Sequence, residues 1–165
     1  MYKGQANVRN DKRGTGRALM PQAWAYFDTS VLVKRYIGET GSVQARALLR
    51  RHDFLSSSII NPELLSAFSR RKRSGELSEA HFNALLSRVQ NDRVQWELIE
   101  VGSVVLHGAE QLIKGTIAVR TLDAIHIASL MTFKTTVAIE TPFVTADARQ
   151  RDAARQVGLD VVWVG

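Results

Sequence analysis

The chain has 165 residues, of which 45% are hydrophobic and 23% charged, and it contains no cysteine. These values are ordinary for one globular domain, and they exclude a disordered chain, a disulfide scaffold, a thiolate zinc site and a cysteine nucleophile. The formal net charge is +6, which favours polyanionic partners in general without identifying one.

The positive charge is concentrated before residue 20. We expect residues 1–19, which have three glycines and no apolar period, to form a flexible basic arm, and residues 20–165 to form a single domain. The interpretation we favour is that the arm is not native and that the start lies at Met20; the alternative is an arm that binds nucleic acid. The charged residues of the arm are Lys3, Arg9, Asp11, Lys12, Arg13 and Arg17.

The sequence contains no sign of export or membrane insertion. No apolar run approaches the roughly 18–20 residues that a membrane helix needs, and the N-terminus lacks the apolar segment of a secretory signal. The absence of cysteine also fits a reducing compartment. We therefore expect a cytoplasmic protein without membrane contacts.

In the first half of the chain, short apolar segments alternate with helical patterns. Residues 24–27 are predicted to form a buried strand, and residues 55–60 a second strand that serines interrupt. Asn61 as an N-cap and Pro62 at the first helical position then predict a helix that stops at Gly75. The other helices predicted here are residues 31–37, residues 42–51 and a helix capped by Ser78.

The second half continues this alternation. Residues 96–101 are predicted to form a strand, and residues 103–114 a helix that stops at Gly115. The helix TLDAIHIASLM, capped by Thr121, is apolar nearly all round, so we expect it to be buried. The last predicted elements are strand 142–145, helix 146–157 and strand 160–164. Short apolar strands separated by helices predict an α/β fold, a three-layer α/β/α sandwich around a mainly parallel sheet.

Four acidic residues fall near one edge of this predicted sheet. Asp28 ends the first strand, and Asp147 comes two residues after the strand that ends at residue 145. Glu63 and Asp123 lie in the first turns of two helices. Because ligands bind beyond the carboxyl ends of parallel strands, we expect these four carboxylates to meet there.

Each acid taken alone also has a structural interpretation. The helix dipole favours acids in a first turn, which explains Glu63 and Asp123, and Asp28 and Asp147 are typical turn residues. The combination favours a site, because Asp123 lies in the most apolar helix, on the same face as His126. Clustered carboxylates repel one another unless a cation neutralises them, and all-oxygen ligation suits Mg²⁺ or Mn²⁺. Such sites suit phosphoryl transfer.

Four segments, in order, resemble the motifs of the PIN domain family and most closely those of VapC-type toxins of bacterial toxin–antitoxin pairs. They are YFDTSVLVKRY, NPELLSAFSRR, RTLDAIHIASL and FVTADARQRDAARQVGLDVVWV, and the resemblance covers about residues 24–164. It supports the predicted PIN-like sandwich. Carried over residue by residue, the family's metal-binding acids fall on Asp28, Glu63, Asp123 and Asp147.

Further positions match the family less directly. Thr145 corresponds to a small hydroxyl residue that holds metal or water, and Thr29 and Ser30 match the polar pair after the first acid. Some members have a further acid after the fourth, and Asp152 is the nearest candidate here. The arm before Met20 departs from the compact start of the family.

The resemblance implies an endoribonuclease that depends on Mg²⁺ or Mn²⁺ and cuts single-stranded RNA, leaving a 5′-phosphate and a 3′-hydroxyl. In the toxin subset, cleavage of tRNA or rRNA stops translation. The resemblance also implies a homodimer and a small VapB-like antitoxin partner whose basic tail enters the active site.

Basic residues near the predicted site are the candidate RNA contacts. Two cations follow Asp28 by a turn or two, where they could reach a phosphate, and a run of four ends the helix that carries Glu63. Such a run is either a solvated helix end, stabilised by the dipole, or an RNA-backbone contact. The candidates are Lys34, Arg35, Arg70, Arg71, Lys72 and Arg73.

His126 has two interpretations. It is either a metal ligand or general base beside Asp123, or a hydrogen-bonded residue of a buried helix. We keep the second interpretation, because the site of the family is built from oxygen ligands.

Three rival functions remain open. A phosphotransfer protein of the haloacid-dehalogenase type would use Asp28 as its nucleophile, but it needs a second aspartate where this chain has Ser30. A catalytically weak module would bind RNA or a protein partner through the basic arm and Arg70–Arg73. A PIN-type nuclease of RNA processing or decay would act without an antitoxin.

Overall fold

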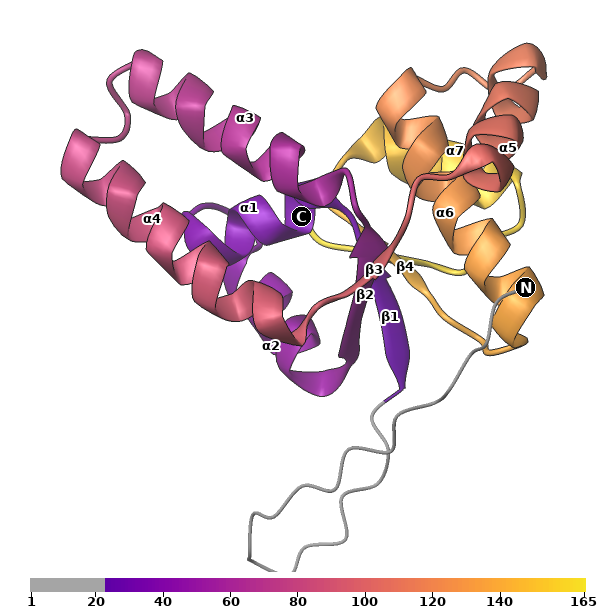
Figure 1. Cartoon of the computed structure of the whole chain (residues 1–165), viewed down its shortest axis with the longest axis horizontal. Coiled ribbons are helices and arrows are strands. Elements are labelled where there is room, and N and C mark those ends of the chain that lie inside the picture. The colour runs from indigo at the N-terminus through magenta and orange to yellow at the C-terminus, as the bar shows by residue number, and fades with distance from the viewer. Residues whose placement is uncertain (1–22) are drawn as a thin grey trace, which may run out of the picture.

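The computed structural model describes residues 23–165, so the arm expected over residues 1–19 lies outside the described residues. Its core is a sheet of five parallel strands in the order β3-β2-β1-β4-β5 (Figure 1). The strands are β1 (Trp24–Phe27), β2 (Asp53–Ser57), β3 (Glu97–Ile99), β4 (Phe143–Thr145) and β5 (Val161–Trp163). The predicted α/β class with a mainly parallel sheet is confirmed.

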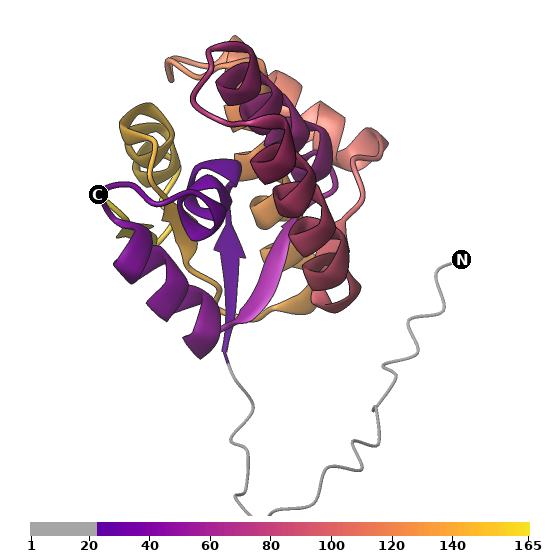
Figure 2. The ribbon, with the colours of Figure 1, turned by 90° about the vertical axis from the view of Figure 1, so that its left-hand side faces the viewer.

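Helices flank both faces of this sheet, which confirms the predicted sandwich (Figures 1 and 2). Helices α1 and α2 pack on one face and α6 and α7 on the other, while α3 and α4 form a hairpin against α1. The helices are α1 (Thr29–Tyr36), α2 (Ser42–Arg51), α3 (Ile60–Arg73), α4 (Glu79–Asp92), α5 (Ser103–Lys114), α6 (Thr121–Val137) and α7 (Ala148–Gln156).

Strand β1 lies at the centre of the sheet and is buried on both faces. Ala25, Tyr26 and Phe27 are all fully buried. Tyr26 packs with Leu130 of α6 on one face, and Phe27 packs with Val31 of α1 on the other. Since burying a large apolar side chain contributes about 1.5–3 kcal/mol, this strand holds the two helical layers together.

Helix α6 is buried as predicted. Its residues 124–130 are all buried, because α5 covers the side that does not face the sheet. The two helices approach closely: a Cβ added to Gly108 of α5 would lie 3.3 Å from the Cβ of Ala128. Among residues 23–165, no helix combines the length and the hydropathy needed to cross a membrane.

Two helix starts differ from the prediction. Helix α3 begins at Ile60, so Asn61 lies inside the first turn instead of capping it, and β2 ends earlier than expected. Pro62 still fits, because N–H groups of the first turn have no helical partner. Helix α6 likewise begins at Thr121 without a side-chain cap. The predicted cap of α4 is confirmed, since Ser78 accepts a hydrogen bond from the first turn.

Another difference concerns the third strand. Strand β3 covers Glu97–Ile99 and is shorter than the strand predicted over residues 96–101. Trp96 lies between β3 and a short 3₁₀ turn over residues 93–95. Helix α6 extends to Val137, six residues beyond the predicted segment TLDAIHIASLM. The remaining elements agree with the prediction to within a few residues at each end.

The order of the strands creates the site. The chain adds β2 and β3 on one side of β1, and β4 and β5 on the other. At such a switch point the connections leave in opposite directions and open a crevice at the carboxyl edge. The register pairs Phe27 with Val144, which places Asp28, the residue after β1, beside Thr145, the last residue of β4.

Candidate active site

A cleft of about 1140 Å³ opens at this carboxyl edge. The four acids singled out from the sequence all line it, and each comes from a different part of the fold. They are Asp28 after β1, Glu63 in the first turn of α3, Asp123 in the first turn of α6 and Asp147 at the cap of α7. The structure thus brings together residues that lie up to 119 positions apart in the sequence, although their roles stay predictions.

Asp28 is the most deeply buried of the four, with 3% of its surface exposed. Its Oδ1 accepts hydrogen bonds from the Ser30 hydroxyl at 2.7 Å and from the backbone N–H of Val31 at 3.3 Å. Its Oδ2 accepts from the Thr145 hydroxyl at 2.9 Å. Burial raises the pKa of Asp28 to about 6, although these hydrogen bonds favour the charged form.

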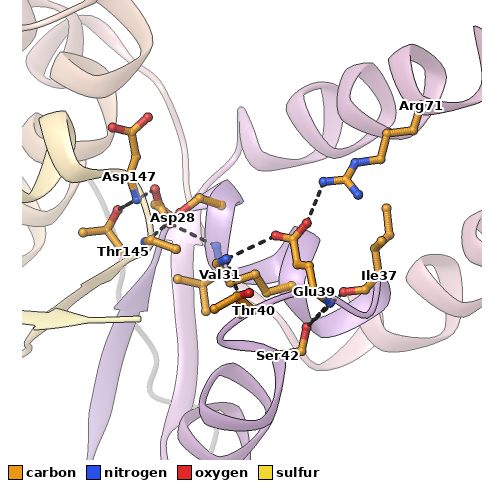
Figure 3. A network of polar contacts seen from close by, with 12 residues as sticks. Asp28, Val31, Ile37, Glu39, Thr40, Ser42, Arg71, Thr145 and Asp147 are labelled. Atoms are coloured by element: carbon orange, nitrogen blue, oxygen red, sulfur yellow. Dashed lines mark hydrogen bonds and ion pairs between the residues drawn. The ribbon is translucent and has the colours of Figure 1, made fainter. Parts of the chain in front are cut away.

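Hydroxyl groups connect the ends of β1 and β4 around this carboxylate (Figure 3). The Ser30 hydroxyl accepts a hydrogen bond from the backbone N–H of Ala146 at 2.8 Å, and that of Thr145 accepts from the N–H of Asp147 at 3.0 Å. Asp147 in turn caps α7 through its Oδ1. The hydroxyl groups predicted from the sequence therefore orient the carboxylate of Asp28, and that of Thr145 also binds the backbone of Asp147.

Glu63 is held by His126, a contact that the sequence analysis missed. The Nε2 of His126 lies 2.7 Å from Glu63 Oε2, which also accepts a hydrogen bond from Thr29. The Nδ1 of His126 lies 2.8 Å from the Tyr26 hydroxyl in the core. Burial alone would raise the pKa of Glu63, but the hydrogen bonds from His126 and Thr29 lower it overall. His126 is a hydrogen-bonded core residue, as interpreted, and it also orients a carboxylate.

Asp123 is half-buried and accepts no hydrogen bond within residues 23–165. Burial raises its pKa, and so does the negative charge of Asp147. The charges of His126, Arg120 and Arg149 oppose that shift. Two carboxylates that face the same cleft thus repel each other, which is the electrostatic condition that a cation relieves.

Several predicted basic contacts line the same cleft. They are Lys34 on α1 and Arg70 and Arg71 on α3. Arg120, just before α6, lines the cleft as well, and the sequence analysis missed it although it stands three residues before Asp123. Glu39 and Gln150 are further lining residues without a signal in their local sequence.

Four other candidates lie outside the cleft lining. Arg35 pairs with Asp92 of α4 at 2.8 Å, so it points along the helical hairpin and not toward the acids. Asp152 is exposed on α7 and pairs with its neighbour Arg151. It lies five residues after Asp147 on this helix, on a side that does not face the cleft. The set outside the lining is Arg35, Lys72, Arg73 and Asp152.

The four acids fit a hard divalent cation, because such ions prefer oxygen ligands and all four side chains supply carboxylate oxygens. Glu63 Oε1 and both oxygens of Asp123 accept no hydrogen bond from residues 23–165 and so are free to bind. Among those residues, however, no three acidic or histidine side chains lie close enough together to hold one ion. A bound Mg²⁺ would therefore draw the acids closer or keep several water ligands, as this ion usually does.

Comparison with protein families gives one match, to the PIN domain, over residues 25–156. No curated protein matches the chain significantly. PIN domains are generally nucleases, which are hydrolases, and they generally depend on divalent metal ions.

Replacing Asp28 by Asn should stabilise the metal-free protein. Burial raises the pKa of Asp28 from 3.8 to about 6, so the folded state binds its proton more tightly than the unfolded chain. The stability contributed by this residue therefore falls as the pH rises from about 4 to about 6. At pH 7 we expect Asp28→Asn to raise the free energy of unfolding by roughly 1–3 kcal/mol, and at pH 4 by much less.

Urea denaturation at both pH values in EDTA measures this difference. Asp53→Asn, at the exposed amino end of β2, is the matched control and should change little at either pH. Equal effects of Asp28→Asn at pH 4 and pH 7 would contradict the assignment of a buried, charged Asp28.

Replacing His126 by Leu should release Glu63. The Tyr26 hydroxyl and the Glu63 carboxylate both lose a partner, so we expect the free energy of unfolding to fall by about 1–3 kcal/mol. The pKa of Glu63 should rise, because the hydrogen bond from His126 lowers it. Carbon-13 NMR titration of the glutamate carboxyls measures this shift, with the exposed His107→Leu as control. An unchanged pKa of Glu63 would show that His126 does not orient it.

Proposed function

The chain belongs to the PIN domain family, and on that premise we propose that it is an endoribonuclease that depends on Mg²⁺ or Mn²⁺. One observation carries the proposal: the carboxylates of Asp28, Glu63, Asp123 and Asp147 line a single cleft together with arginine and lysine side chains. Carboxylates are the ligands that such cations prefer, and cationic side chains attract the phosphates of nucleic acid.

The reaction is the hydrolysis of a phosphodiester. The oxygen of a water molecule forms a bond to phosphorus, the bond between phosphorus and the 3′ oxygen breaks, and the leaving oxygen takes up a proton. The products are a 5′-phosphate and a 3′-hydroxyl. A divalent cation held by the four acids would lower the pKa of the attacking water and would stabilise the charge that develops on the phosphate.

The residues of this chain would bind the cation or orient the carboxylates that bind it. Asp28, Glu63, Asp123 and Asp147 would hold the cation. Thr145 and Ser30 orient Asp28, which fixes the carboxylate against rotation. His126 and Thr29 orient Glu63 through its Oε2 and leave Oε1 free to bind. Pre-oriented ligands matter because misplaced groups lose much of their catalytic effect.

The cations of the cleft would bind the RNA backbone. Lys34, Arg70, Arg71 and Arg120 line the cleft beside the acids. They can neutralise phosphates on either side of the bond that is cut, without reading the bases. The family resemblance points to single-stranded RNA as the substrate, and a groove with cations along it suits the backbone of a single strand.

We further propose, from the family resemblance, that the chain is the toxin of a toxin–antitoxin pair. It would inhibit translation in the cytoplasm by cutting tRNA or rRNA, it would form a homodimer, and a small VapB-like antitoxin would inhibit it. The alternative within the family is a nuclease of RNA processing or decay that has no antitoxin.

A second candidate is a module that binds RNA or a protein partner and cuts slowly. One observation favours it: no three acidic or histidine side chains within residues 23–165 lie close enough to hold one ion. Such a module would show RNA binding that weakens with salt and no cleavage that depends on metal.

The test is cleavage of total RNA by the purified chain with Mg²⁺ or Mn²⁺, followed by mapping of the 5′ ends. We expect discrete cuts with 5′-phosphates that disappear in EDTA. Asp123→Asn should reduce the cleavage rate at least about 100-fold, because even residues behind metal ligands commonly contribute 10–100-fold.

Asp53→Asn is the matched control, since it makes the same substitution at the opposite edge of the sheet. It should keep the wild-type rate. Full activity of Asp123→Asn would refute the assignment of the site. Intact RNA with both metals would favour the binding module.

A further inference from the structure

Glu39 lies at the edge of the cleft between two of its cations. It belongs to the connection between α1 and α2. Its Oε1 lies 3.2 Å from the ammonium of Lys34, and its Oε2 accepts a hydrogen bond of 2.7 Å from Arg71 on α3 (Figure 3). All three residues line the same cleft as the four acids. One carboxylate therefore bridges cations from two helices at the proposed RNA-binding edge.

The position of Glu39 is set by its own connection. Its backbone N–H donates to the hydroxyl of Ser42 at 2.9 Å, and that hydroxyl donates to the carbonyl of Ile37 at 3.1 Å. Ser42 is 4% exposed, and the two hydrogen bonds of its hydroxyl are partly buried. Gly41 follows with a positive φ of 85°, and a Cβ there would lie 3.3 Å from the Lys34 side chain. These contacts fix the backbone at Glu39, from which its carboxylate reaches both cations.

The two cations differ from an ordinary surface pair. The side chain of Lys34 is only 14% exposed, and its ammonium also donates to the carbonyl of Thr40 at 2.7 Å. Burial alone would raise the pKa of Glu39, but Arg71 and Lys34 lower it overall, so Glu39 is charged at neutral pH. An arginine and a lysine that share one anion form the kind of pair that binds a phosphate group.

The balance of charge makes this pair important. Within residues 23–165, six carboxylates line the cleft against four lysine and arginine side chains. Glu39 pairs with two of those four cations, and Glu76 lies 3.9 Å from Arg71 as well. Among the described lining cations, Arg70 and Arg120 form no ion pair and are open to an entering polyanion. RNA that enters the cleft must therefore compete with Glu39 for Lys34 and Arg71.

We propose that Lys34 and Arg71 form a subsite for a backbone phosphate, that Glu39 occupies this subsite in the free protein, and that the phosphate displaces it on binding. The inference rests on the proposed function, because it takes RNA as the substrate. Displacement costs the same free energy for every strand whose phosphate uses this subsite, so it lowers their affinities alike. Glu39 therefore acts as an internal competitor of RNA at this subsite.

The test measures RNA binding without cleavage, in an Asp123→Asn background with Mg²⁺. Fluorescence anisotropy of a labelled short oligouridine gives the dissociation constant over a series of salt concentrations. We expect Glu39→Gln to tighten binding about 3- to 10-fold, since two partly exposed ion pairs no longer compete. The slope of log affinity against log salt should stay close to that of the wild type, because the same phosphate contact forms in both proteins.

Glu79→Gln is the matched control. Glu79 on α4 pairs with Lys72, which lies on α3 like Arg71, but neither Glu79 nor Lys72 lines the cleft. Both substitutions remove one negative charge, so a general electrostatic gain would appear in both. In a Lys34→Gln background the gain from Glu39→Gln should shrink, because half of the subsite is missing. Circular dichroism of each variant tests whether it is folded. Glu39→Ala serves as a second variant at the same position.

The outcomes separate this inference from the proposed function. Unchanged or weaker binding by both Glu39 variants would show that Glu39 positions the cations and does not compete, which overturns the inference even if the wild type cuts RNA. An equal gain in Glu79→Gln would overturn it too. A wild type that cuts no RNA, with the Glu39-specific gain present, would refute only the nuclease. Absence of RNA binding in every variant would refute both.

Discussion

The buried carboxylate of Asp28 is the constraint on which the rest of the site depends. It ends the central strand, caps α1 and accepts a hydrogen bond from the last residue of β4, so three elements meet at one side chain. Taking a carboxylate out of water costs free energy, and neighbouring hydroxyls offset only a part, which is why its pKa is raised to about 6. A cation would remove that cost. The fold is therefore less stable than it could be at the point where the proposed chemistry needs charge.

The remaining acids are held by different means, and the differences follow from their surroundings. Asp147 is fixed by the helix that it caps, while Glu63 is fixed by His126. Through His126 the carboxylate is linked to Tyr26 on β1, inside the core cluster that α6 and α7 cover. Asp123 has no such link and faces Asp147 across the cleft. It is the acid most free to move toward an ion.

The distribution of charge across the cleft is asymmetric. The acids gather at the carboxyl edge of the sheet, and most of the lining cations come from α1 and α3. These cations can attract a polyanion, whereas the acids repel it unless a metal ion neutralises them. Glu39 modifies this arrangement, because it already pairs with Lys34 and Arg71. Binding at this edge thus becomes an exchange of anions and not a simple attraction.

The sequence by itself determined the α/β class, nearly every element and the four acids, because each of these depends on local pattern: apolar period, glycine stops, and acids placed just after strands or at helix starts. The prediction from sequence was wrong where the position of a residue depends on tertiary contacts. Asn61 reads as a cap, yet α3 begins one residue earlier, and Arg35 reads as a phosphate contact, yet Asp92 on α4 pairs with it. Only the tertiary structure decided that His126 orients Glu63 and that Glu39 bridges two helices. The contact of His126 with Glu63 and that of Arg71 with Glu39 each join residues more than thirty positions apart, and Glu39 lies in a loop that has no regular period. The geometry of both contacts exists only once the helices have packed on the sheet.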